Sequence, residues 1–245
     1  MLFTNRYLRQ GRSELSSSSN IHKRQAKTIS STQQNNTGTD SSSSGLRKFA
    51  ATVSAVFSPP LLTTLMLAIV GFKLNNREAW IWLVSYALIS TLVPSVMIYW
   101  MVRQGTVSDF HMRNRDERGR PLLVIFLLSA SLSVVFLLAG APRVITALTV
   151  GAAIQALVMW RVTSKWKISG HSAAAGSFLA IILALNASYV IPALILLALV
   201  IWARVLRDRH TLMQSLAGAL LGFASIGLPL LYIMPLCTGP VLACV

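Results

Sequence analysis

Between two long apolar runs lies the basic break Ala203-Arg204-Val205-Leu206-Arg207-Asp208-Arg209-His210-Thr211-Leu212-Met213-Gln214. Two upstream breaks, residues 113–121 and 167–171, have the same polar character, and each also opens an apolar run. Basic residues beside apolar runs are typical of loops that join membrane-spanning helices. The three breaks therefore indicate how the chain is divided into spans.

The composition is that of a membrane protein. Hydrophobic residues make up 54% and charged residues 12%, with a mean hydropathy of +0.61, whereas soluble domains have about 25% charged residues. A helix that crosses about 30 Å of hydrocarbon needs about 20 residues. The run 168–203 is long enough for two such helices, with a break at 186–188. We therefore predict an all-α, multi-pass transmembrane helical bundle of about six to seven spans. The runs without Asp, Glu, Lys or Arg are 49–72, 79–102, 121–142, 144–160, 168–203 and 211–245.

The first 46 residues differ from the rest. They are rich in Ser, Asn, Gln and Thr, so they cannot bury enough apolar surface to offset their ordering entropy. We predict a disordered, basic tail over 1–46 and one integral transmembrane domain over 47–245. The Arg- and Ser-rich, acid-poor tail has a faint likeness to an organelle transit peptide, but we favour a cytoplasmic tail.

The net charge of +15 would suggest nucleic acid as the partner of a soluble protein. Beside apolar spans, basic loops instead match membrane orientation and anionic headgroups. We therefore expect membrane lipids as partners and no nucleic acid. Cys237 and Cys244 form no metal spacing and no disulfide framework.

Two predicted spans separate the first break from the second, and two more separate the second from the third. An even number of crossings returns the chain to the same side, so all three breaks should face one compartment. Of the 22 Lys and Arg residues, all but Lys73, Arg77 and Arg143 lie on that side. The positive-inside rule then predicts a multi-pass protein, in the cell membrane, with these loops on the cytoplasmic side.

The chain has seven acidic residues, and none lies inside a predicted span. It has no Gly-rich phosphate loop and only one acidic cluster, so we expect neither a metal nor a coupled ion site. What remains is arginine, for bidentate phosphate contacts, and histidine, as nucleophile or general acid. Taken singly, such arginines are usually topology determinants and such histidines are usually structural. The candidates are Arg113, Arg120, Ser169, Gly170, His171, Arg204 and His210.

The spacing of these residues resembles the three-part signature of the type 2 phosphatidic acid phosphatase and vanadium haloperoxidase superfamily. The order and every interval fit, although Arg113, Ile168, Ala203 and Gln214 replace the usual Lys, Pro, Ser and Asp. The matching parts are Arg113, six residues, Arg120-Pro121; then Ile168-Ser169-Gly170-His171; then Ala203-Arg204, five residues, His210, three residues, Gln214.

The resemblance implies a role for each position. His210 would attack phosphorus and carry a phosphohistidine, and His171 would protonate the leaving alcohol. The remaining positions would bind the phosphoryl oxygens: Arg113, Arg120, Ser169, the Gly170 N–H and Arg204. No metal or cofactor is implied. The expected function is a membrane phosphatase that hydrolyses a lipid or isoprenoid phosphate monoester or diphosphate.

Gln214 is the departure that matters most. Four residues after His210, it lies on the same helical face and could accept the imidazole N–H, yet it supplies no negative charge. By analogy with a protease triad, losing that charge can cost roughly 10⁴ in turnover. One alternative is a catalytically weak or inactive relative that binds or moves phospholipids. A haloperoxidase and a plain structural membrane protein are less favoured.

Overall fold

The computed structural model describes residues 44–108, 116–185 and 187–233, and this part of the chain is helical without a strand. The all-α prediction is therefore confirmed. The helices are Ser44–Val56, α2 (Pro59–Leu74), α3 (Arg77–Ala87), α4 (Val93–Arg103), α5 (Gly119–Leu138), α6 (Arg143–Thr163), α7 (Gly170–Leu185), α8 (Val190–Leu206) and α9 (Leu212–Ile233). Short turns of π- or 3₁₀-helix, η1 (Leu88–Leu92), η2 (Asp116–Arg118) and η3 (Ala187–Tyr189), precede α4, α5 and α8. Most of the predicted tail and Arg113 lie outside the described residues.

In the described part of the chain, five helices are long and apolar enough to cross a membrane. They are the continuous helix Arg77–Arg103, α5, α6, the segment Ala187–Leu206 and α9. A sixth span results if Ser44–Val56 and α2 count as one broken helix. Helix α7 has only 16 residues, fewer than the roughly 20 that a full crossing needs. The helices follow the predicted order, but the fifth predicted span, which opens at the 167–171 break, is a shorter, buried helix.

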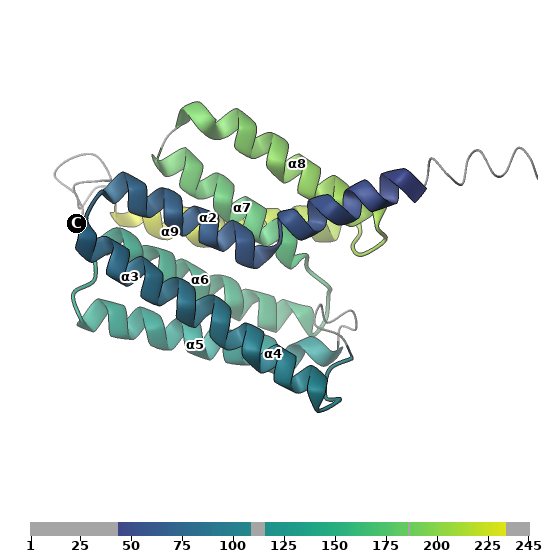
Figure 1. Cartoon of the computed structure of the whole chain (residues 1–245), viewed down its shortest axis with the longest axis horizontal. Helices are drawn as coiled ribbons and strands as arrows, with labels where there is room; N and C mark the ends of the chain where they lie inside the picture. Colours follow the sequence, from purple (N-terminus) through teal and green to yellow (C-terminus); the bar gives the residue numbers. More distant parts are fainter. Residues whose placement is uncertain (1–43, 109–115, 186, 234–245) are drawn as a thin grey trace, which may run out of the picture. The chain divides into compact units, whose positions relative to one another are not determined.

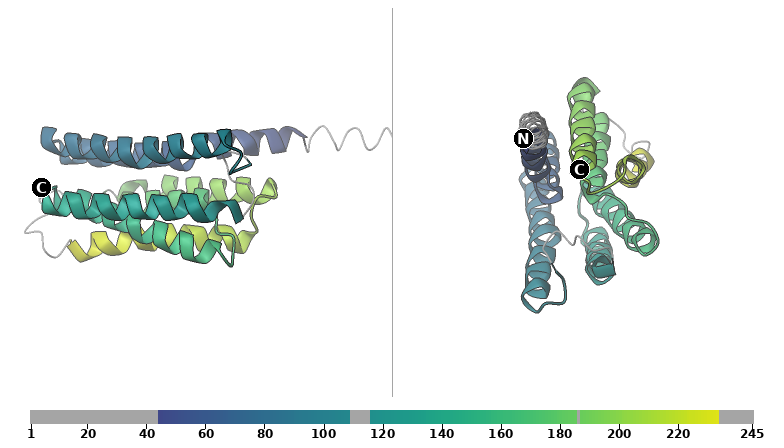
Figure 2. Two further views of the ribbon diagram at one scale, coloured as in Figure 1. Left: turned by 90° about the horizontal axis from the view of Figure 1, so that it is seen from below. Right: turned by 90° about the vertical axis from the view of Figure 1, so that its right-hand side faces the viewer.

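The helices of the compact unit Ala50–Val245 pack in layers (Figures 1 and 2). Helices α2, α3 and α4 form one layer, α5, α7 and α8 the next, and α6 and α9 the third. The central helix α7 contacts α2, α8 and α9, and it is buried from Ser172 to Ile182. Three helices thus surround α7, which explains why its buried residues are small or apolar.

The first predicted span is broken where the sequence has Pro59-Pro60. Ser58 is extended, with φ −70° and ψ 153°, because a residue before proline avoids the helical region. The two prolines then occupy the first helical positions of α2, where a missing N–H costs nothing. The flanking helices Ser44–Val56 and α2 are bent by 47° as a result.

Pro94 lies inside the second predicted span, residues 79–102. The chain accommodates it by the π-helical turn η1, which ends two residues before Pro94. Proline removes one backbone donor and crowds the carbonyl four residues earlier, and a wider turn at that point relieves both. Helices α3 and α4 therefore run on as one long element, which Figure 1 shows beside α5.

Glycines allow α7 and α9 to touch through their backbones. A Cβ atom on Gly222 would overlap the Ala173 carbonyl, and one on Gly176 would overlap the Ala219 carbonyl. Close approach through small residues is the usual way that membrane helices associate. The contact fixes the register of α7 against α9, and both helices begin at a predicted site loop.

A buried polar cluster ties α6 to the same pair. Ser177 Oγ and Ser225 Oγ donate to Gln155 Oε1 at 2.9 and 3.0 Å. Both hydroxyls also lie 3.2 Å from the Gly222 carbonyl oxygen. Hydrogen bonds between membrane helices are each worth about 1 kcal/mol, so this cluster adds specificity to an otherwise apolar contact.

Candidate active site

The third break is a compact turn that holds His210 between two helix caps. Helix α8 ends in a Schellman motif: Arg209 N–H donates to the Arg204 carbonyl at 3.1 Å, and Asp208 N–H donates to the Val205 carbonyl at 2.9 Å. Asp208 takes the left-handed conformation at φ 53°, which Asp tolerates better than most residues. His210 follows two residues later and is only 7% exposed.

Helix α9 then begins with a capping box made by Thr211 and Gln214. Thr211 N–H donates to Gln214 Oε1 at 3.1 Å, and Gln214 N–H donates to Thr211 Oγ1 at 3.2 Å. This is the reciprocal pairing that Thr-x-x-Gln supports at a helix start. The amide oxygen of Gln214 thus serves the helix cap, and His210 Nδ1 is buried without a hydrogen-bond partner among the described residues.

The second break docks directly on the third. Ser169 N–H donates to the Gln214 carbonyl at 3.2 Å, and the Ser169 carbonyl lies against Gly218, where a Cβ would not fit. Ser169 is fully buried, and its hydroxyl accepts from Ser172 N–H at 3.3 Å as the cap of α7. Gly170 and His171 follow in the first turn of α7, both partly exposed.

The first break is described only in part. Glu117 Oε2 accepts from both the N–H and the hydroxyl of Ser108, at 2.9 and 2.8 Å. Arg120 is exposed in the first turn of α5. Arg113 lies outside the described residues, so its role stays a prediction.

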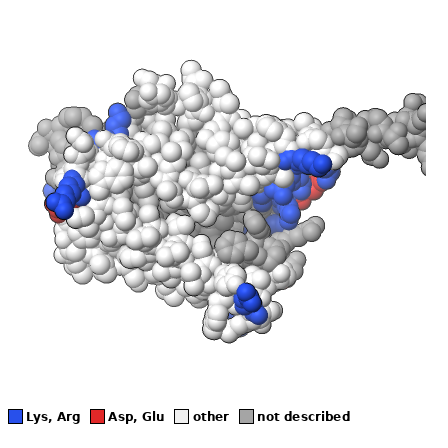
Figure 3. All heavy atoms as spheres, viewed as in Figure 1, with Lys and Arg blue, Asp and Glu red and all other residues white. Residues whose placement is uncertain are grey.

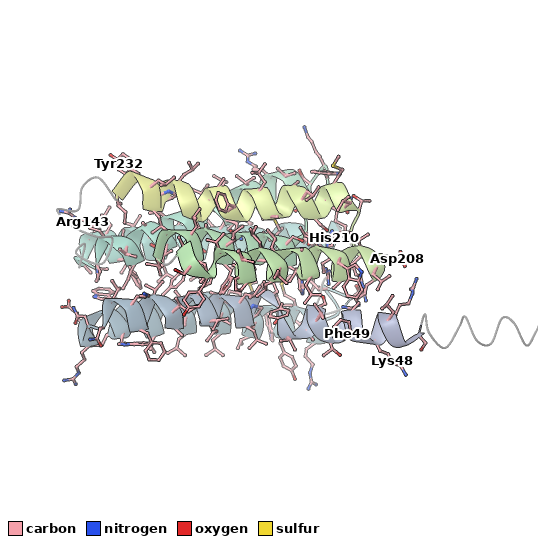
Figure 4. All side chains as sticks on the ribbon, turned by 90° about the horizontal axis from the view of Figure 1, so that it is seen from above. Lys48, Phe49, Arg143, Asp208, His210 and Tyr232 are labelled. Carbon is pink, nitrogen blue, oxygen red and sulfur yellow. The ribbon has the colours of Figure 1, made fainter. Side chains whose placement is uncertain are left out.

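His210 is surrounded by positive charge drawn from all three breaks. Burial lowers the pKa of His210 to about 3, and the charges of Arg204, Arg118 and Lys167 add to this shift, while the neighbouring Gln214 side chain opposes it. The imidazole is therefore neutral at pH 7. Figure 4 shows His210 and Asp208 at one end of the helices, with Arg143 and Tyr232 at the other.

Two of these cations were missed by the sequence reasoning. Arg118 lies two residues before the predicted Arg120, and Lys167 lies four residues before His171. Neither occupies a position of the three-part signature, and their charge alone gave no reason to choose them. Figure 3 shows Lys and Arg side chains at the ends of the helices, with a broad uncharged surface between them.

Arg204 is held in this cluster by one described contact. Its Nη1 donates to Ser54 Oγ at 2.8 Å, whereas its Nε is buried without a partner. Thr163 Oγ1 at the end of α6 and Ser215 Oγ in the first turn of α9 are also buried without partners in the described ranges. Polar atoms left unpaired inside a protein are costly, and a bound anion would offer acceptors for such donors.

No three His, Cys, Asp or Glu side chains in the described ranges come together in a way that could hold a metal ion. The donors at this end of the helices are nitrogens that carry or share positive charge. Such a set suits an anion better than a cation.

The fold and this site define a polytopic α-helical protein with a histidine set among cations at one end of its helices. A comparison with protein families gives a match to the model described as PAP2 superfamily, over residues 120–235. This match is consistent with a member of the PAP2 superfamily, which confirms the resemblance seen in the sequence and suggests phosphatase-type activity on phosphate esters. Comparisons with curated proteins and with solved structures gave no match.

Proposed function

We propose that this protein is an integral membrane phosphatase that hydrolyses a lipid or isoprenoid phosphate through a phosphohistidine on His210. The single observation that carries the proposal is the environment of His210: a buried, neutral imidazole beside Arg204, Arg118 and Lys167. A neutral imidazole has a free lone pair to attack phosphorus. The surrounding cations would stabilise the charge that gathers on the phosphoryl oxygens.

The reaction has two steps. A ring nitrogen of His210 forms a bond to phosphorus while the bond to the ester oxygen breaks, and His171 gives its proton to the leaving alcohol. In the second step His171 removes a proton from water, which attacks the phosphohistidine and releases inorganic phosphate. Arg204 and Arg120, with Arg113, would bind the phosphoryl oxygens in both steps. Neither step uses a metal ion.

A lipid substrate is supported by the position of the site. His210 lies in the loop between α8 and α9, so a phosphate headgroup could reach it while its acyl chains stay in the bilayer. Ser169 was expected to bind a phosphoryl oxygen through its hydroxyl. That hydroxyl instead accepts a hydrogen bond from Ser172 N–H at the start of α7. The backbone of Gly170 is partly exposed, and a Cβ there would lie an ordinary 3.8 Å from the Met159 side chain, so Gly170 is the better placed contact of the two.

The test is phosphate release from phosphatidate and from a polyprenyl diphosphate by the purified protein in detergent. We expect release by the native chain and none by His210→Ala. Equal rates from the two proteins would show that the release does not come from this site and would end the proposal.

A second function, binding or moving phospholipid without turnover, is favoured by one observation. The Gln214 amide oxygen accepts a hydrogen bond in the helix cap. Position 214 also lacks the carboxylate that the family signature has there. In that case Gln214→Asp should create phosphate release that the native protein lacks, while both proteins bind phosphatidate vesicles equally. Release by the native protein would reject this second function.

A further inference from the structure

Arg204 is oriented by a residue far away in the sequence. Its Nη1 donates to the hydroxyl oxygen of Ser54 at 2.8 Å, across 150 positions of the chain. Ser54 is 3% exposed, so water does not compete for this bond. The guanidinium has five N–H donors in a rigid fork, and fixing one of them fixes the direction of the others.

The surrounding packing explains why Ser54 can reach Arg204. Ala50 and Val53, on the same helix as Ser54, form an apolar cluster with Ala203, the residue before Arg204. Ala50 and Ala203 are both fully buried, and their small side chains let the two helices approach closely. Phe57 and Trp202 pack against the cluster and close it.

The hydroxyl of Ser54, which accepts the hydrogen bond from Arg204, suits an anion site. An acidic residue in this place would pair with Arg204 and cancel its charge, whereas a hydroxyl accepts a hydrogen bond and leaves the charge intact. Within the part of the chain that the structure describes, the Nε of Arg204 stays buried without a partner, and Arg118, Arg207 and Arg209 add positive charge around it. The cluster is thus held in place without being neutralised.

We propose that Ser54 is a positioning residue of the phosphate site: it fixes the Arg204 fork so that the remaining donors meet a phosphoryl group. This inference rests on the proposed function insofar as the anion is a substrate phosphate. Ser54 lies well before the matched residues 120–235. The working site of this chain therefore extends into the helix Ser44–Val56, beyond the part that the family model covers.

The test measures inorganic phosphate binding to the full-length protein in detergent by titration calorimetry. Ser54→Ala should weaken phosphate binding about tenfold, the effect of losing one good hydrogen bond to a charged group. Ser54→Thr keeps the hydroxyl and should bind like the native chain. Ser58→Ala is the matched control, because Ser58 is partly buried nearby and makes no side-chain cap hydrogen bond.

A second variant keeps the idea testable if Ser54→Ala does not fold. Ser54→Asp would place a carboxylate on Arg204, so a folded variant should lose phosphate binding more severely than Ser54→Ala. The proposal is overturned if Ser54→Ala or Ser54→Asp binds phosphate as tightly as the native chain. It is also overturned if Ser58→Ala weakens binding as much as Ser54→Ala does, or if the native chain binds no phosphate. If the native chain binds phosphate in this pattern but releases none from any lipid, the phosphatase proposal fails while Ser54 keeps its role.

Discussion

The backbone N–H of Ser169 donates to the carbonyl of Gln214 at 3.2 Å, which joins the start of α7 to the start of α9. Ser169 directly precedes α7, which carries His171. Gln214 lies in the first turn of α9, which follows His210. The bond is between backbone groups, so it sets the distance between the two loops whatever the side chains are. The site geometry is therefore a property of helix packing as well as of residue identity.

The pH dependence of stability should report the state of His210. Its pKa is lowered from 6.5 to about 3 in the fold, so between these values the unfolded chain binds a proton that the folded chain does not. The free energy of unfolding should therefore fall as the pH falls through this window, by up to about 1.4 kcal/mol per pH unit. Thermal unfolding at about pH 7 and about pH 5.5 measures this difference.

The matched variant for that measurement is His210→Asn, which cannot titrate. Its melting temperature should change less between the two pH values than that of the native protein. An equal change in both proteins would mean that His210 is not held neutral by its surroundings.

Replacing Gly222 should separate α7 from α9. A Cβ at this position would overlap the backbone of Ala173, so even Gly222→Ala forces the helices apart. Overpacking of this kind costs roughly 1–3 kcal/mol, which thermal melting in detergent can detect. Gly227→Ala is the control, since its Cβ would lie an ordinary 3.7 Å from Ala180 Cβ. Equal melting temperatures for the two variants would contradict the packing described here.

Gln214 should matter to stability separately from any role in chemistry. Gln214→Ala removes half of the capping box with Thr211 and should destabilise the protein by about 1 kcal/mol. Gln214→Glu keeps the cap and places a negative charge at a helix N-terminus, which is favourable. We expect the melting temperatures to fall in the order Glu, Gln, Ala at this position. A neutral Ala variant would show that the cap is dispensable.

The side of the membrane that the site faces can be settled by labelling single cysteines. In a background without Cys237 and Cys244, an impermeant thiol reagent would be added to intact cells that carry Thr106→Cys. Thr106 is exposed at the end of the helices that bears the site loops. Our prediction of a cytoplasmic site requires that this cysteine be labelled only after lysis.

The control for orientation is Ala139→Cys, at the exposed turn after α5 and hence at the opposite end. It should be labelled in intact cells. The reverse pattern, with Thr106→Cys labelled from outside and Ala139→Cys protected, would place the site on the outer face.

The uncharged runs were enough to predict the order of helices. A long uncharged segment in hydrocarbon must pair its own backbone polar groups, and a helix does so. The break between α7 and α8 followed from the polar residues at 186–188, and η3 begins there. A proline removes a backbone N–H and so leaves one carbonyl without its helical partner. How that carbonyl is satisfied depends on the neighbouring helices. Pro59 and Pro94 therefore locate the irregular turns in the sequence but do not determine their geometry. The predicted roles of the site residues remain predictions.

Other features had no local signal. Ser54 meets Arg204 only because the helix Ser44–Val56 packs on the end of α8, and no spacing rule links residues so far apart. Arg118 and Lys167 act on His210 through space. The capping box is the exception: Thr211-x-x-Gln214 is a recognisable helix start, and it offers a plain structural reason for a glutamine at this position.

The length of α7 has a consequence for where an anion would sit. Sixteen residues span about 24 Å at 1.5 Å per residue, some 6 Å less than the hydrocarbon thickness. Ser169 is pinned to Gln214 and Gly218, so the first turn of α7 lies about one turn deeper than the first residue of α9. His171, two residues further along α7, thus lies deeper than the α8–α9 loop, where dissolved counterions shield charge less than they do in open water.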